Sequence, residues 1–269
     1  MLTPLQSKLL EMFAWLTSFL EKNQIRYYAM GGTALGAARH GGFIPWDDDI
    51  DICIPRKDYE RLINLLREPI DHYVIETSDS EDKDFIYNFA KFYDTNTTLT
   101  EELRRDITRG VYIDIFPLDG LGNTLEEAIC YYKKIDRMNM LLAMISCKFR
   151  KDRAFLKNIA VAIGRLIPIS PKWLIKKIHN QCRQRNFDDY KYVTNCMSTY
   201  RTKEILDKSI LGVPKTYNFE NMQIKGPEYM DRYLSSIYHN WRDLPPLEKR
   251  HTAHDFKSID LNKSYLNRD

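Results

Sequence analysis

Hydrophobic residues recur at helical spacing at the start of the chain. A helix over residues 1–20 would place Leu5, Leu9, Phe13, Leu16 and Leu20 on one face. Polar residues interrupt this segment, whereas a secretory signal peptide has a basic start and an unbroken apolar core. The pattern therefore predicts an amphipathic helix and argues against a signal peptide.

Short apolar runs follow, and glycine or proline bounds most of them. They predict strands at residues 25–30, 49–54, 72–77, 85–93 and 111–116. The run at 49–54 alternates with a period of two, and Pro55 ends it before a predicted helix. Pro117 and the following Asp-Gly turn are expected to close the last run.

From residue 124 onward the hydrophobic pattern becomes helical. Periodic stretches predict helices over residues 125–147, 154–166, 171–185 and 227–241. We therefore expect an α/β (α+β) fold with two parts. Residues 1–122 form a catalytic core built on a mixed sheet with flanking helices, and residues 123–269 form a mainly helical region whose C-terminal segment packs back on that core.

Charge is unevenly distributed over the 269 residues, although the net charge is only +3. Residues 148–185 contain eleven Lys or Arg and a single acid, Asp152, so this segment carries +10 and the rest carries −7. Two explanations of this segment are equally good. It is either the solvated basic face of a helix, or a surface that attracts an anionic membrane, a polyphosphate or a nucleotide-linked substrate. We find no nucleic-acid reader motif, and no apolar stretch approaches the ~20 residues of a spanning helix.

The five cysteines are odd in number and widely spaced, and no C-x-x-C pair occurs. Neither a zinc ribbon nor a disulfide framework is indicated. Reduced thiols in a cytoplasmic protein are the simplest interpretation.

The strongest chemical signal is the acidic run Trp46-Asp47-Asp48-Asp49-Ile50-Asp51. Residues two apart on a strand share a face, so Asp49 and Asp51 should project together while the isoleucines enter the core. Two adjacent carboxylates repel each other, and a hard divalent cation such as Mg²⁺ (or Mn²⁺) would relieve the repulsion. Asp47 and Asp48 are further candidate ligands, and a solvated acidic turn is the alternative.

Asp114 is a lone acid in the apolar run Val111–Phe116. A carboxylate in such a strand is costly unless a charge or metal pairs with it. We predict that Asp114 is a third metal ligand on a neighbouring strand, with a salt bridge to a core arginine as the alternative.

Gly31-Gly32-Thr33 lies between a predicted strand and a predicted helix. Glycines let the backbone approach a ligand, and the N-terminus of a helix offers free N–H groups to a phosphate. Two glycines in a turn are common, so this motif alone is weak evidence for a phosphate site. It supports such a site only because it lies shortly before the acids.

These motifs together resemble the LicD family of the nucleotidyltransferase superfamily, which is related to the fukutin-type enzymes. The segments MGGTALGAARHGGFIPWDDDIDICIPRKDY and VYIDIFPLDG carry the resemblance, and YLSSIYHNWRDLPPLEKRHTAH matches more loosely. The usual Tyr-Gly of that last stretch is Tyr238-His239 here. Little between residues 126 and 217 resembles the family.

The resemblance implies a nucleotidyltransferase fold and a phosphotransferase. Such an enzyme moves a phospho-alcohol group, such as phosphocholine, from a CDP-activated donor to a glycan hydroxyl in cell-surface polysaccharide, teichoic acid or lipopolysaccharide synthesis. Asp49, Asp51 and Asp114 would hold the metal, and Asp114 is the candidate to take the acceptor's proton. The enzyme would be cytoplasmic, with peripheral contact to the inner membrane face.

Other positions are weaker candidates for substrate binding. Arg39 and Lys91 are expected to meet a phosphate, with a surface ion pair and a snorkelling lysine as the alternatives. The tail residues Arg250, His251 and His254 are expected to reach the nucleotide, although a lone histidine is more often structural. Trp46 would stack on a base or simply pack.

Two rival functions share these residues. A nucleotidyltransferase that adds a nucleoside monophosphate from an NTP to a small molecule would use the same fold and metal set. A non-catalytic binding protein would keep the fold alone, although the presence of all three candidate metal carboxylates argues against it.

Overall fold

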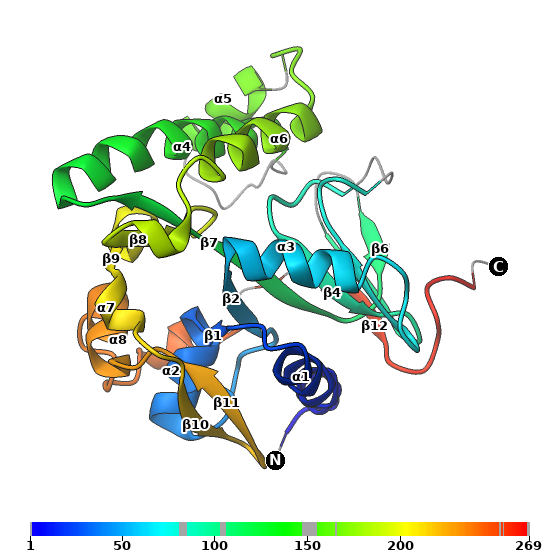
Figure 1. Cartoon of the computed structure of the whole chain (residues 1–269). Coiled ribbons are helices and arrows are strands. Elements are labelled where there is room, and N and C mark those ends of the chain that lie inside the picture. The colour runs from blue at the N-terminus through cyan, green and yellow to red at the C-terminus, as the bar shows by residue number, and fades with distance from the viewer. Residues whose placement is uncertain are drawn as a thin grey trace.

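The computed structural model describes residues 2–80, 85–102, 106–146, 155–164, 166–252, 254 and 256–267. Figure 1 shows a central sheet with α1 and α3 on one side and a separate layer formed by α4, α5 and α6. The α-helices are α1 (Pro4–Lys22), α2 (Gly31–His40), α3 (Arg56–Leu65), α4 (Leu125–Ser146), α5 (Phe155–Gly164), α6 (Pro171–Cys182), α7 (Lys208–Leu211) and α8 (Met230–Tyr238). None of the described helices is long and apolar enough to cross a bilayer.

The main sheet is mixed, as predicted. Its strands run in the order β1 (Tyr28–Ala29), β2 (Asp51–Pro55), β7 (Tyr112–Gly122), β4 (Ala90–Asp94) and β3 (Tyr73–Glu76). Strands β2 and β7 are parallel, and the other neighbours are antiparallel. On the far part of β7 the sheet continues through β8 (Tyr192–Asn195) and β9 (Leu206–Asp207).

Strand β7 is longer than the sequence predicts, because it continues through Pro117 and Gly120 instead of ending before them. Proline lacks an N–H group and normally interrupts a ladder. Pro117 lies where one edge of β7 changes its partner strand. On that edge β4 pairs with β7 as far as Ile115, and β8 pairs with it from Leu118 onward. The expected turn at Asp119-Gly120 is therefore wrong, and both residues lie within the strand.

The expectation of a mainly helical second part holds for α4, α5 and α6, but strands follow them. Beyond β8 and β9, a hairpin forms from β10 (Lys215–Phe219) and β11 (Met222–Gly226). Near the C-terminus, β12 (Phe256–Asp260) pairs with β5 (Thr98–Glu101), which also pairs with β6 (Ile107–Arg109). The C-terminal strand thus pairs with a strand of the first part of the chain.

The alternation along β2 and β7 separates the core from the opposite face of the sheet. The isoleucines at 50, 52, 54, 113 and 115 are fully buried in one cluster with residues of α1 and α3. The intervening positions, including Asp51 and Asp114, line a cavity on the opposite face. The period-two pattern of the sequence therefore explains which side chains are free for chemistry.

Candidate active site and metal centre

Four of the predicted acids line one cavity of about 390 Å³: Asp47, Asp49, Asp51 and Asp114. Asp51 and Asp114 are Cα partners across the parallel pair β2 and β7, and Asp49 lies two residues before Asp51. The loop that carries Asp47 is held by α1, since the buried side chain of Gln6 donates to the Asp47 carbonyl at 2.8 Å. The cavity size suits a small-molecule substrate.

The protein keeps these carboxylates close together at an electrostatic cost. Burial and the neighbouring Asp49 raise the pKa of Asp47 to about 8. Burial, Asp49 and Asp114 raise the pKa of Asp51 well above its usual value. Burial also raises the pKa of Asp114, to about 6, against the opposing effect of Lys91. Burial, reinforced by the neighbouring carboxylates, therefore disfavours the ionised form of these side chains.

Lys91 supplies one of the positive charges at this site. Its ammonium lies 3.0 Å from Asp114 and 3.7 Å from Glu101, and it sits over the Tyr112 ring at 3.2 Å from the centroid. The side chain is only 1% exposed and does not line the cavity. The structure therefore gives Lys91 a carboxylate partner rather than the open cleft position expected for a phosphate contact.

His254 brings a second positive charge from the C-terminal segment. Its Nδ1 lies 2.8 Å from Asp48, and its Nε2 lies 3.7 Å from Asp49. Burial lowers the pKa of His254, but the hydrogen bond to Asp48 and nearby carboxylates outweigh it and raise the pKa to about 9. His254 lines the cavity, whereas its hydrogen-bond partner Asp48 does not. Asp48 therefore orients the histidine ring.

The Gly-Gly-Thr turn makes room for the acids. Gly31 and Gly32 begin α2, and Gly31 has a φ of +55°, a conformation that favours glycine. A Cβ atom at Gly32 would lie 2.7 Å from the Asp47 carboxylate, and one at Gly31 would lie 3.3 Å from that of Asp51. The two glycines are therefore required for the close approach of the carboxylates.

Two polar groups of this turn already have protein partners. The Gly31 N–H donates to the Tyr233 hydroxyl at 2.9 Å, and Thr33 Oγ1 accepts from the Asp51 N–H at 2.8 Å. Thr33 thus fixes the start of β2, and Tyr233 fixes the start of α2. The Gly31 N–H and the Thr33 hydroxyl oxygen, both expected to contact a phosphate, are therefore already hydrogen-bonded within the protein.

The opposite wall of the cavity comes from the end of β8 and the segment that follows it, which sequence analysis did not identify. It contributes Asn195, Met197, Ser198, Thr199, Tyr200 and Glu204. Glu204 is buried, accepts a hydrogen bond from Tyr233 at 3.1 Å and has its pKa raised by burial to about 7. The hydroxyl of Tyr200 bonds that of Tyr238 in α8.

Comparison with known proteins identifies the domain that holds these residues. A family model described as LicD/FKTN/FKRP, nucleotidyltransferase domain, matches residues 24–150. The lipopolysaccharide cholinephosphotransferase LicD of Haemophilus influenzae is 29% identical over 241 residues, which cover 87% of this chain and 88% of that protein. The chain carries a LicD-family domain.

Two further relatives cover much less of this chain. The human ribitol 5-phosphate transferase FKRP is 48% identical over 44 residues, which are 16% of this chain and 9% of FKRP. A Rickettsia prowazekii protein of uncharacterised function is 51% identical over 47 residues, or 18% of either chain. The family model includes the Gly-Gly turn and the acids but ends before the wall formed by residues 195–204.

Three other sequence candidates lie outside the cavity. Arg39 donates to the carbonyls of Trp241 and Asp243, Arg250 donates to that of Pro245, and the exposed His251 ring contacts the neighbouring Thr252 carbonyl. None of the three lines the cavity. Arg39 and Arg250 thus bind carbonyls of the C-terminal segment instead of meeting the acids. Trp46 also packs, partly buried, and its ring lies 5.7 Å from the Arg250 guanidinium.

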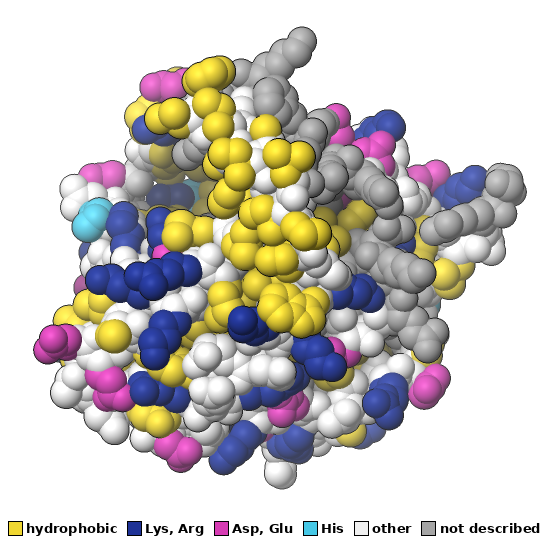
Figure 2. All heavy atoms as spheres, turned by 90° about the horizontal axis from the view of Figure 1, so that it is seen from above, with side chains coloured by type: hydrophobic (Ala, Val, Ile, Leu, Met, Phe, Trp, Pro, Cys, Tyr) yellow, Lys and Arg dark blue, Asp and Glu magenta, His cyan; other side chains and the backbone are white. Residues whose placement is uncertain are grey.

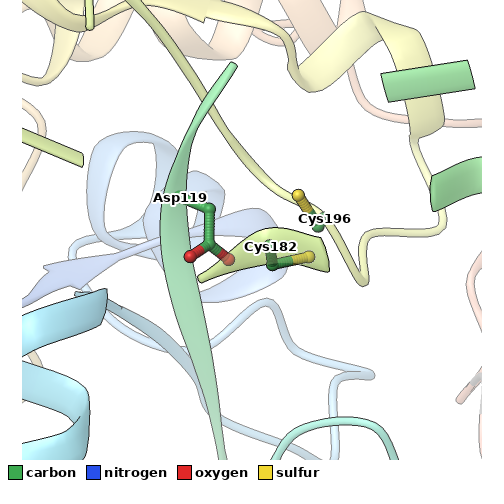
Figure 3. A group of neighbouring side chains, drawn as sticks. All are labelled: Asp119, Cys182 and Cys196. Carbon is green, nitrogen blue, oxygen red and sulfur yellow. The ribbon is translucent and has the colours of Figure 1, made fainter. Parts of the chain in front are cut away.

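A second cluster of possible metal ligands lies nearby, where Asp119, Cys182 and Cys196 converge from β7, α6 and the segment after β8 (Figure 3). Both oxygens of Asp119 accept from the buried guanidinium of Arg56, at 2.8 and 2.6 Å. That positive charge disfavours a dication at the same carboxylate. We therefore interpret this cluster as a structural ion pair that joins α3 to β7.

Proposed function

We propose that this chain is a metal-dependent phosphotransferase that moves a phospho-alcohol group, such as phosphocholine, from a CDP-activated donor to a hydroxyl of a cell-surface glycan. The observation that carries the proposal is the cavity in which Asp51 faces Asp114 beside Asp49. Two relatives with a shared domain support it, because one is named a cholinephosphotransferase and the other a ribitol 5-phosphate transferase.

The residues of the cavity fit a Mg²⁺ or Mn²⁺ ion. Asp49, Asp51 and Asp114 offer hard oxygen ligands, and Asp47 lines the same cavity. Burial and the neighbouring carboxylates raise their pKa values, and a bound dication would favour their ionised forms. When bound, the ion would neutralise the donor diphosphate and polarise the phosphorus under attack.

In the proposed reaction, the oxygen of the acceptor hydroxyl forms a bond to the phosphorus that carries the alcohol. The bond from that phosphorus to the bridging oxygen breaks, and CMP leaves with that oxygen. The proton of the acceptor hydroxyl passes to a carboxylate of the cavity, for which Asp114 is our candidate. The protein's task is to align the two substrates and exclude water. We assign the alignment to the acids on β2 and β7 and to the facing wall of residues 195–204.

The state of the cysteines fits a phosphotransferase that works in a reducing compartment. The described cysteines at 53, 130, 182 and 196 are free thiols, and two of them lie beside each other in the Asp119 cluster without a disulfide. Cys147 lies outside the described residues. We therefore place the reaction in the cytoplasm.

Product analysis tests the proposal against its rivals. The purified chain is incubated with CDP-choline, CDP-glycerol or CDP-ribitol and a glycan acceptor, with Mg²⁺ or with EDTA. We expect CMP release that requires both metal and acceptor and that is lost in Asp51→Asn. Pyrophosphate release from an NTP would favour the nucleotidyltransferase, and the absence of turnover with every donor would favour the binding protein.

A further inference from the structure

Helix α5 exposes large hydrophobic side chains on the face that points away from the protein. Its inner face packs on α4 through Val161 and Gly164, and a Cβ atom at Gly164 would lie 2.6 Å from the Met144 carbonyl. Its outer face carries Phe155, Leu156, Ile159 and Ile163, whose exposed fractions are 78%, 77%, 38% and 53%. A surface helix normally places polar residues on that side, so this face is expected to have an apolar partner.

The same apolar surface continues beyond α5. Leu166 is 83% exposed and Trp173, at the start of α6, is 55% exposed. Figure 2 looks down on the side of the molecule where α4, α5 and α6 lie, and it shows hydrophobic side chains gathered in a run with Lys and Arg on its flanks. We call this surface the α5–α6 ridge, defined by Phe155, Leu156, Ile159, Ile163, Leu166 and Trp173.

Positive charge borders the ridge. Lys176 and Lys177 are exposed on α6, and the Lys177 ammonium lies 5.0 Å from the centroid of the Trp173 ring. The sequence from residue 155 to 185 contains no Asp or Glu. Aromatic and aliphatic side chains beside lysines are the composition of helices that lie in the interface of an anionic bilayer.

We propose that the α5–α6 ridge docks on the surface of an anionic lipid bilayer, with its apolar side chains among the headgroups and its lysines on the lipid phosphates. This inference goes beyond the proposed reaction and does not depend on it. A helix of ten residues is about 15 Å long, which is half the thickness of the hydrocarbon core, so α5 lies on the membrane instead of spanning it.

A second copy of the chain is a poorer occupant. Two ridges brought together would place Lys176 and Lys177 of each copy near those of the other, with no acid from residues 155–185 to pair with them. Like charges across an interface are unfavourable, whereas anionic headgroups neutralise them.

Vesicle co-sedimentation of the full chain tests the proposal. We expect binding to phosphatidylcholine vesicles that contain about 30% phosphatidylglycerol and much weaker binding to pure phosphatidylcholine. The double variant F155S/L156S and the charge variant K176E/K177E should each lower the partition coefficient at least about tenfold. V213S/L247S, which alters two equally exposed hydrophobic residues elsewhere, is the matched control and should bind as the wild type does.

Tryptophan fluorescence gives an independent reading. Insertion of the ridge should shift the emission to the blue on addition of anionic vesicles, and Trp173→Phe should remove most of that shift. The proposal is overturned by no vesicle binding, by equal binding to neutral vesicles, or by equal loss in the control. It is also overturned if the wild type forms dimers that F155S/L156S abolishes while vesicle binding stays unchanged.

Discussion

Asp51 and Asp114 face each other in direct register across the parallel strands β2 and β7. Parallel strands bring residues with the same orientation onto one face, so two acids 63 positions apart in the chain share a cavity. The repulsion that results is visible in the pKa of Asp51, which burial, Asp49 and Asp114 raise well above its usual value. Four consequences of this site and its supports can be tested.

The first prediction concerns metal binding. Without metal, Asp51→Asn should increase the free energy of unfolding, because it removes one charge from a buried acidic cluster. With Mg²⁺ at about 100 times its dissociation constant, the wild type should gain about 2.7 kcal/mol, and Asp51→Asn and Asp114→Asn should lose most of that gain. Thermal unfolding with and without Mg²⁺ measures both effects.

Asp189→Asn is the control for this experiment, because Asp189 is exposed and lies outside the cavity. It should respond to Mg²⁺ as the wild type does. Full Mg²⁺ stabilisation in both cavity variants would mean that the metal binds elsewhere.

The second prediction concerns the Gly-Gly turn. Gly32→Ala should leave the fold intact, since the residue is helical and the atom that it meets belongs to a side chain, the Asp47 carboxylate. The displaced carboxylate should weaken Mg²⁺ affinity about tenfold or more, measured by calorimetry. Gly41→Ala serves as the comparison, because Gly41 has nothing within 4 Å, and its φ of +66° predicts a loss of stability alone. An unchanged affinity in Gly32→Ala would show that Asp47 does not contribute to the metal site.

The third prediction concerns the buried pair Arg56 and Asp119, whose side chains are 5% and 0% exposed. Removal of one partner leaves a buried charge, so Arg56→Met and Asp119→Leu should each lower the free energy of unfolding by about 3–5 kcal/mol. The double variant should recover much of the loss, and urea denaturation of all four proteins measures the coupling.

The exposed pair Arg183 and Glu60 provides the reference for that cycle, with side chains 39% and 41% exposed. Its coupling energy should stay below about 1 kcal/mol because water screens the charges. Comparable coupling in the two cycles would contradict the view that Arg56 and Asp119 hold α3 against β7.

The fourth prediction concerns pH. Burial raises the pKa of Glu204 from 4.5 to about 7 in the folded protein, so the folded state binds its proton more tightly than the unfolded chain. Its stabilising contribution is complete below pH 4.5 and is lost as the pH rises through 7, with a total of about 3 kcal/mol. Stability of the metal-free protein should therefore fall less between pH 5 and 8 in Glu204→Gln than in the wild type. Parallel pH profiles of the two proteins would contradict a raised pKa at this position.

The sequence by itself determined the local pattern of this protein. The alternation of acids and isoleucines at 49–54 and the lone acid at 114 indicated which side chains leave the core, because strand geometry fixes that with no knowledge of the partner. The same local rules predicted α1 and the helices that became α4, α5 and α6. These local rules wrongly predicted that the strand ends at Pro117. The proline is tolerated inside β7 because β8 replaces β4 as the neighbouring strand at that point.

Only the tertiary structure decided what each of those side chains meets. Lys91 has the sequence context of a cleft residue, yet its partner is Asp114, which β7 brings alongside β4. The far wall at residues 195–204 and the hydrogen bond that the Gly31 N–H donates to Tyr233 carry no sequence signal, because they depend on how segments more than 80 residues apart pack. Side-chain direction is a property of one strand, whereas the partner of a side chain is set by packing between segments.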